Sequence, residues 1–189
     1  MQEYGRILLP VPNKLAVIIL NWRIINMDFK DQPFIPMLFG GDINTYSVAR
    51  AFYEEYQVKT YVFGKFPSGP SYNSNIIEYH ADLKIDTDDV FMKTVCDFAA
   101  AHADKTVLTI GCGDSYVALC SRHKDEMPEN VVAPYIDFEL MDRLQQKELF
   151  YRLCREHDID FPDTLVFRYG MDLDFELPFS FPVILKPSN

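Results

Sequence analysis

Two short apolar runs, each followed by glycines and then by a stretch with helical spacing, constrain the fold of this chain most. Phe34–Phe39 precedes Gly40-Gly41, and Thr106–Ile110 precedes Gly111-Cys-Gly113. A continuous apolar run, a tight turn and a helix are typical of a buried strand in a parallel sheet. The pattern therefore predicts an α/β fold with a small doubly wound parallel sheet.

The same alternation continues from Pro33 to Pro134. Strands are expected at Phe34–Phe39, Thr60–Phe63, Asp82–Ile85, Thr106–Ile110 and Val131–Ala133. Helices are expected after the first, third and fourth strands, capped by Asp42 or Asn44, by Thr87 or Asp88, and by Asp114 or Ser115, and Pro67–Asn75 is expected to be a loop. Strands and helices that alternate in this way give right-handed crossovers and a sheet with helices on both faces.

The segment before Pro33 does not continue this pattern. Residues 1–32 are expected to be an extension outside the main fold, and residues 33–136 to form the α/β domain. The apolar run Leu15–Leu20 is shorter than the roughly 20 residues of a membrane span. Residues 1–26 either come from a start codon upstream of Met27 or contribute an extra strand at Leu15–Leu20, and both alternatives stay open.

The pattern changes again after Pro134. Helices are expected at Phe138–Met141 and Gln145–His157, and strands at Thr164–Arg168 and Phe181–Leu185. The sequence stops where this last strand enters a loop, which is a poor place for a domain to end. We therefore expect the chain to be the front part of a longer protein, with residues 137–189 as the truncated beginning of its next domain.

Charge and cysteine content exclude several function classes. Lys plus Arg is 18 and Asp plus Glu is 28, so the net charge is −10. A nucleic-acid site or an anionic membrane surface needs a basic face, which this balance disfavours. Cysteines at 96, 112, 120 and 154 form no C-x-x-C pair, and the histidines form no H-x-x-x-H, so we expect no closed zinc site and reduced thiols in a cytoplasmic protein.

The string Val107–Asp114, V-L-T-I-G-C-G-D, is the first motif that could carry chemistry. Free amides and the helix dipole after such a turn favour an anion or a nucleotide. The string is similar to the first motif of S-adenosylmethionine-dependent methyltransferases, but Ser115 replaces the final glycine and the motif lies on the fourth strand. A tight turn, a ligand site at the carboxyl edge and a methyltransferase all stay open, as does a catalytic thiol at Cys112 without an evident base.

A second and longer motif lies near the end of the sequence. Lys147–Thr164 gives a helix that begins with lysine, a turn and F-P-x-T, and Phe181–Asn189 reads F-P-V-I-L-K-P-S-N. In order and spacing these motifs resemble the entry to an ATP-grasp domain, and the resemblance covers about Phe34–Asn189. It implies that residues 33–136 are the Rossmann-like pre-ATP-grasp domain and that an incomplete ATP-grasp subdomain follows.

The resemblance implies roles for two lysines at the nucleotide. Lys186 would contact the α- and β-phosphates of ATP, and Lys147 would lie near the nucleotide. The chemistry agrees, because phosphates need fixed positive charge and a lysine at a strand end supplies a point charge from a rigid base. The alternative for each residue is an ordinary solvated lysine.

The segments Phe34–Phe52 and Gly111–Tyr116 resemble D-aspartate ligases of peptidoglycan cross-bridge synthesis. The resemblance implies that ATP activates the β-carboxylate of D-aspartate as an acyl phosphate, and that an amine of a peptidoglycan precursor displaces phosphate. It implies Mg²⁺ with ligands beyond residue 189, so no residue is assigned to metal. Residues that could touch substrate are Gly40, Gly41, Asp42, Asn44, Gly113, Asp114 and Ser115. For each of them, turn or cap chemistry is the alternative.

The expected function is therefore the amino-terminal fragment of an ATP-dependent carboxylate–amine ligase, inactive by itself. The alternatives are a Rossmann-like nucleotide or amino-acid binding module without catalysis and, third, a methyltransferase. Small-molecule carboxylate and amine substrates are the expected partners, and the oligomeric state stays open. One structural expectation follows directly: Gly40 and Gly111 should lie at the same carboxyl edge of the sheet.

Overall fold

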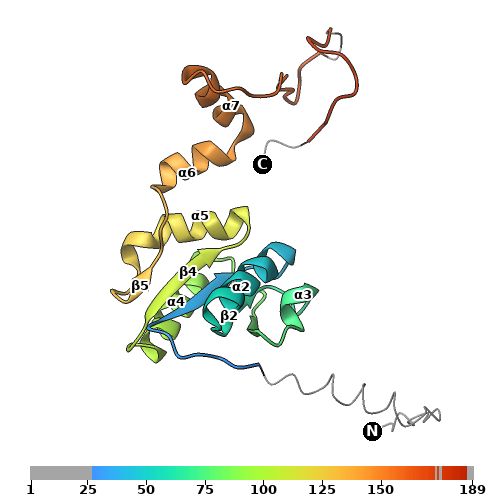
Figure 1. The fold of residues 1–189 in the computed structure, drawn as a ribbon. Helices are drawn as coiled ribbons and strands as arrows, with labels where there is room; N and C mark the ends of the chain where they lie inside the picture. The colour runs from blue at the N-terminus through green and yellow to red at the C-terminus, as the bar shows by residue number, and fades with distance from the viewer. Residues whose placement is uncertain (1–26, 173, 175, 187–189) are drawn as a thin grey trace, which may run out of the picture.

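The computed structural model describes residues 27–172, 174 and 176–186. Five parallel strands form one sheet in the order β3-β2-β1-β4-β5 (Figure 1). The strands are β1 (Phe34–Phe39), β2 (Thr60–Gly64), β3 (Ile77–Ala81), β4 (Thr106–Gly111) and β5 (Val131–Val132). The α/β fold with a parallel, doubly wound sheet is thus confirmed. The two alternatives for residues 1–26, an upstream start codon and an extra strand at Leu15–Leu20, lie outside the described residues.

Helices cover both faces of this sheet. The helices beside the sheet are α2 (Ile43–Tyr56), α3 (Gly69–Tyr72), α4 (Asp88–Ala101) and α5 (Asp114–His123), and the short 3₁₀ turn η1 (Lys124–Glu126) follows α5. Two further helices lie beyond the sheet: α6 (Phe138–Gln145) contacts α5, and α7 (Lys147–Glu156) contacts α6 (Figure 1). Side chains that alternate along β1 enter two separate cores, because successive residues of a strand point to opposite faces. Met37 and Phe39 pack with α4 and α5, whereas Leu38 packs with Ala49 of α2.

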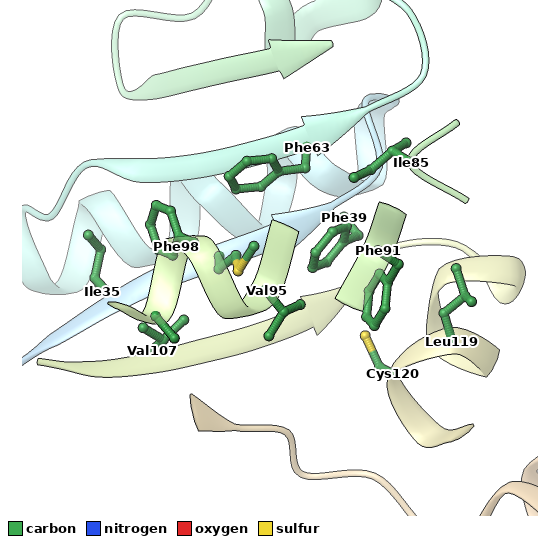
Figure 2. Packing of buried hydrophobic residues seen from close by; sticks show 12 residues of the cluster. Ile35, Phe39, Phe63, Ile85, Phe91, Val95, Phe98, Val107, Leu119 and Cys120 are labelled. Atoms are coloured by element: carbon green, nitrogen blue, oxygen red, sulfur yellow. The ribbon is translucent and has the colours of Figure 1, made fainter. Parts of the chain in front are cut away.

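An aromatic cluster forms the centre of the core beneath α4. Phe39 and Phe91 are fully buried, and their ring centroids lie 4.6 Å apart. Phe63 and Phe98 continue the cluster in an edge-to-face contact at 5.6 Å. Figure 2 shows Phe39 of β1 and Phe91 of α4 facing each other, with Cys120 of α5 beside them. This packing fixes the end of β1, and therefore the turn that follows it, against the rest of the domain.

The third strand is a correction to the sequence analysis. It was expected at Asp82–Ile85, but β3 is Ile77–Ala81, and Asp82–Ile85 is a turn in which the Ile85 amide donates to the Asp82 carbonyl at 3.1 Å. β3 pairs on one side only and carries Glu78 and His80, so it has no continuous apolar run. The apolar signal came from Ile85, which is buried in the core without being part of a strand.

The segments after Pro134 also differ from expectation. α6 extends to Gln145 instead of ending at Met141, and the expected strands Thr164–Arg168 and Phe181–Leu185 are not formed. Leu185 is 94% exposed, so this apolar run has no neighbouring strand to pair with among the residues that the structure describes. The short helix α3 lies inside the segment that was expected to be a loop.

Residues 27–32 already contact the fold. The Lys30 amide donates to the Gln57 carbonyl at 2.8 Å, Phe29 makes an edge contact with Tyr53, and Lys105 pairs with Asp31. Within the described ranges, no helix is long and apolar enough to cross a membrane.

Candidate functional site

A crevice of about 540 Å³ lies at the carboxyl edge of the sheet. β1 connects through α2 to β2 on one side, and its other neighbour is β4, so the strand order reverses between β1 and β4. In open α/β sheets, ligands bind at such a switch point. Gly111 pairs with Phe39, the residue before Gly40, which confirms that both turns lie at the same edge. The residues lining the crevice are Gly40, Gly41, Asp42, Ile43, Lys65, Phe66, Ser68, Gly69, Pro70, Tyr79, Cys112, Gly113, Ser115 and Tyr116.

Asp42 caps helix α2 with its side chain. Its carboxylate accepts hydrogen bonds from the amides of Asn44 and Thr45 at 3.1 Å, from the Thr45 hydroxyl at 3.1 Å and from the Asn44 side-chain amide at 3.2 Å. Of the two expected caps, Asp42 is therefore the one used, and its carboxylate serves the helix. Asn44 helps to hold Asp42 and does not line the crevice.

Glycines let two loops touch at the floor of the crevice. The Tyr79 hydroxyl, which reaches in from β3, donates to the Phe66 carbonyl at 2.8 Å and lies 3.4 Å from the Gly40 carbonyl. A Cβ on Gly64 would clash with that hydroxyl and with the Gly40 oxygen, and a Cβ on Gly41 would lie 2.6 Å from the hydroxyl. Side chains at these positions would separate the loops, so the shape of the crevice depends on their absence.

Helix α5 begins at the opposite wall. Its N-cap is Gly113, which has no side chain to bond the first amides, so the expected cap at Asp114 or Ser115 is wrong. Gly113 and Ser115 line the crevice, whereas Asp114 does not, and the Asp114 carbonyl accepts a hydrogen bond from Gln145 of α6 at 2.9 Å. A Cβ on Gly111 would lie 2.6 Å from the α5 backbone, whereas the nearest atom to a Cβ on Gly113 would be 3.9 Å away. Gly111 is therefore needed for packing, and Gly113 leaves open space at the crevice.

The thiol of Cys112 is a poor nucleophile in this setting. Burial raises the pKa of the Cys112 thiol to about 11, so the thiolate is scarce at neutral pH. Burial also raises the pKa of Tyr116 to about 12 and shifts the pKa of Tyr79 upward. These groups are neutral at pH 7, which disfavours the catalytic-thiol hypothesis.

Sequence reasoning missed several residues that line the crevice, among them Lys65, Tyr79 and Tyr116. Lys65 follows β2 directly, Tyr116 lies in the first turn of α5, and Tyr79 lies on the misplaced third strand. Lys65 could have been found, because its position after a strand resembles that of Gly40 after β1. Tyr79 could not, because only the pairing of β3 with β2 brings it beneath the glycines.

The two lysines expected at the nucleotide are not among the residues that line the crevice. Lys147 is the first residue of α7 and is partly exposed. Lys186 is exposed and follows exposed Leu185, and Phe181–Leu185 forms no strand, so the expected place of Lys186 at the end of a strand is wrong. Among the described residues, no group of three His, Cys, Asp or Glu side chains could hold a metal ion.

Comparison with known proteins gives one informative match. Over 167 residues the chain is 40% identical to a D-aspartate ligase of Enterococcus faecium (strain Aus0004), an alignment that covers 85% of this chain and 40% of that protein. The chain resembles a D-aspartate ligase. The resemblance expected from the motifs is thus confirmed, and the chain spans 40% of the length of the D-aspartate ligase that it matches. No family model and no solved structure matches the chain.

Proposed function

We propose that this chain is the amino-terminal part of an ATP-dependent ligase that joins a carboxylate, an amino acid such as D-aspartate, to an amine. The observation that carries the proposal is the 40% identity to a D-aspartate ligase over most of the chain. The position of the crevice at the switch point between β1 and β4 supports it, because small substrates bind there in open α/β sheets.

The proposed chemistry has two steps. A carboxylate oxygen of the amino acid attacks the γ-phosphorus of ATP, ADP leaves, and an acyl phosphate forms. The amine nitrogen then attacks the acyl carbon, phosphate leaves, and the nitrogen loses a proton as the amide forms. Mg²⁺ would neutralise charge on the phosphates, and no residue of this chain is assigned to it.

The crevice is proposed to form the substrate side of the active site. Gly40, Gly41 and Gly113 present backbone to the crevice, and Ser115 adds a hydroxyl. Such groups orient a small ligand rather than react with it. The nucleotide side is proposed to include Lys186 and Lys147, by the resemblance to ATP-grasp enzymes.

The test uses the full-length gene product with Mg-ATP, D-aspartate and hydroxylamine. Hydroxylamine converts an acyl phosphate into a hydroxamate, and ADP release reports the first step. We expect both products only when D-aspartate is present. ADP release that is independent of D-aspartate would refute the proposal, and ligand binding without any ADP would indicate a binding module instead.

Variants of the two lysines test the nucleotide side. We expect Lys186→Ala to lower kcat by orders of magnitude, because a lost charge contact to a transferring phosphate costs several kcal/mol and about 1.4 kcal/mol is a factor of ten. Lys147→Ala should have a smaller effect. A turnover near wild type in Lys186→Ala would remove this assignment.

The 189-residue chain by itself provides a second test of the proposed function. We expect it not to release ADP, because phosphoryl transfer depends on metal bridging and a closed cleft. Calorimetry with Mg-ATP should give a dissociation constant in the millimolar range or weaker, equivalent to about −4 kcal/mol at best. A micromolar dissociation constant for ATP would contradict this expectation and indicate that the nucleotide binds at the turn Gly111–Ser115 instead.

A further inference from the structure

The crevice contains a cation that no part of the proposed function uses. Among the described residues that line it, Asp42 and Lys65 carry formal charges. The Asp42 carboxylate accepts four hydrogen bonds from Asn44 and Thr45 at the start of α2 and has little capacity left for a ligand. Lys65 is therefore the charged side chain that remains available to a molecule in the crevice.

Lys65 is held in place and still has hydrogen atoms to donate. Its Nζ atom lies 2.6 Å from the Oδ2 atom of Asp86, and the Lys65 side chain is 39% exposed. An ammonium group has three N–H donors. Asp86 takes one of them and fixes the position of the nitrogen, which leaves donors for a second acceptor.

Two carboxylates lie at this part of the crevice: Asp42, which caps α2, and Asp86, which pairs with Lys65 and also helps to raise the pKa of Tyr116. Tyr79, Tyr116 and Cys112 also line the crevice. The pKa of each of these groups is raised by burial, so they stay neutral at pH 7. The start of α5, with no side-chain cap at Gly113, adds the positive end of a helix dipole at the same crevice.

We propose that Lys65 is a specificity-determining residue that binds the side-chain carboxylate of an acidic amino-acid substrate in the crevice, with Asp86 as the residue that positions its ammonium group. The identity of the substrate rests on the proposed function. The site itself rests on the crevice, on the cation available among its described lining residues and on the ion pair that orients that cation.

Lys59 provides a matched control on the same strand. Lys59 precedes β2 and Lys65 follows it, so the two lysines lie at opposite ends of that strand. Lys59 pairs with Glu78 at 3.1 Å and its side chain is 38% exposed, nearly the same as that of Lys65. Replacing either lysine by glutamine removes one surface ion pair, but only Lys65→Gln changes the crevice.

The test titrates D-aspartate and D-asparagine, whose side chain is an uncharged amide, into full-length protein, with calorimetry as a readout that needs no turnover. We expect Lys65→Gln to weaken D-aspartate binding about tenfold or more, because hydrogen bonds to charged groups are the stronger ones. D-Asparagine binding should change little, Lys65→Arg should recover much of the loss, and Lys59→Gln should bind as wild type does.

Two results would overturn the inference. One is a D-aspartate affinity of Lys65→Gln within about twofold of wild type, well short of the expected loss. The other is the absence of measurable D-aspartate binding by the wild-type protein. The outcome is separable from the proposed function, because a protein that binds D-aspartate through Lys65 but releases no ADP refutes the ligase and leaves the carboxylate site in place.

Discussion

The contact between Gly41 and the Tyr79 hydroxyl can be measured as an energetic coupling. A Cβ on Gly41 would lie 2.6 Å from the Tyr79 Oη atom, and its next neighbours, both atoms of the Tyr79 ring, are at 3.5 Å or more. The clash in Gly41→Ala is therefore with one oxygen atom. Overpacking of this kind costs about 1–3 kcal/mol of unfolding free energy.

Removing that oxygen has its own cost. Tyr79→Phe loses the hydrogen bond to the Phe66 carbonyl at 2.8 Å, which is worth about 1 kcal/mol. If the two changes were independent, the double variant would lose about 2–4 kcal/mol. Because Tyr79→Phe also removes the atom that the new methyl group at position 41 would strike, we expect the double variant to lose only about 1 kcal/mol, which is a coupling of about 1–3 kcal/mol.

Urea unfolding of the chain, followed by circular dichroism, measures this cycle. With a slope of about 2 kcal/mol per molar urea, Gly41→Ala should lower the midpoint by about 0.5–1.5 M. Gly113→Ala is the control, because the nearest atom to its Cβ is 3.9 Å away and its effect should stay within about 0.5 kcal/mol. Additive losses in the double variant would refute the inferred approach of the two loops.

Three further predictions concern the core, the pH dependence and the thiols. Phe91→Ala should cost about 3–5 kcal/mol in the same urea assay, since the ring is fully buried against the sheet, and a loss below about 1 kcal/mol would contradict the core assignment. Hydrogen bonds, first from His123 and then from Arg122, lower the pKa of Asp88 in the folded protein. The stabilisation that the Asp88 carboxylate gives to the fold is therefore present above its unfolded-state pKa of about 3.9 and is lost as pH falls through the lower folded-state pKa. Asp88→Asn should consequently lose less stability than the wild-type protein on acidification below about pH 4. Iodoacetamide at about pH 8 should alkylate exposed Cys96 and spare Cys112, whose pKa is raised to about 11, as peptide mass spectrometry would detect. Equal labelling of the two cysteines would contradict the raised pKa of the partly buried Cys112 thiol.

Local residue patterns were enough to place the two central strands of the sheet, β1 and β4, and the edge at which the crevice lies. Phe34–Phe39 and Thr106–Ile110 are continuous apolar runs that end in glycine, and a strand buried on both faces needs such a run. Two strands of this kind, each followed by a helix, are parallel, so their carboxyl ends meet at one edge. These signals were sufficient to locate the two strands and their turns because each acts within a few residues. They are an apolar run, a glycine and the capping residue Asp42.

Which side chains face the crevice depends instead on long-range pairing. β3 is an edge strand with polar residues, and it is a strand because β2 offers it a row of backbone groups to pair with. Phe181–Leu185 is more apolar than β3, yet it forms no strand among the described residues, because hydrogen bonds from a neighbouring strand, not apolarity, define one. The same pairing carries Tyr79 beneath Gly41, and the end of β2 carries Lys65 to the crevice wall. These contacts join residues far apart in the chain, so no local pattern of residues contains them.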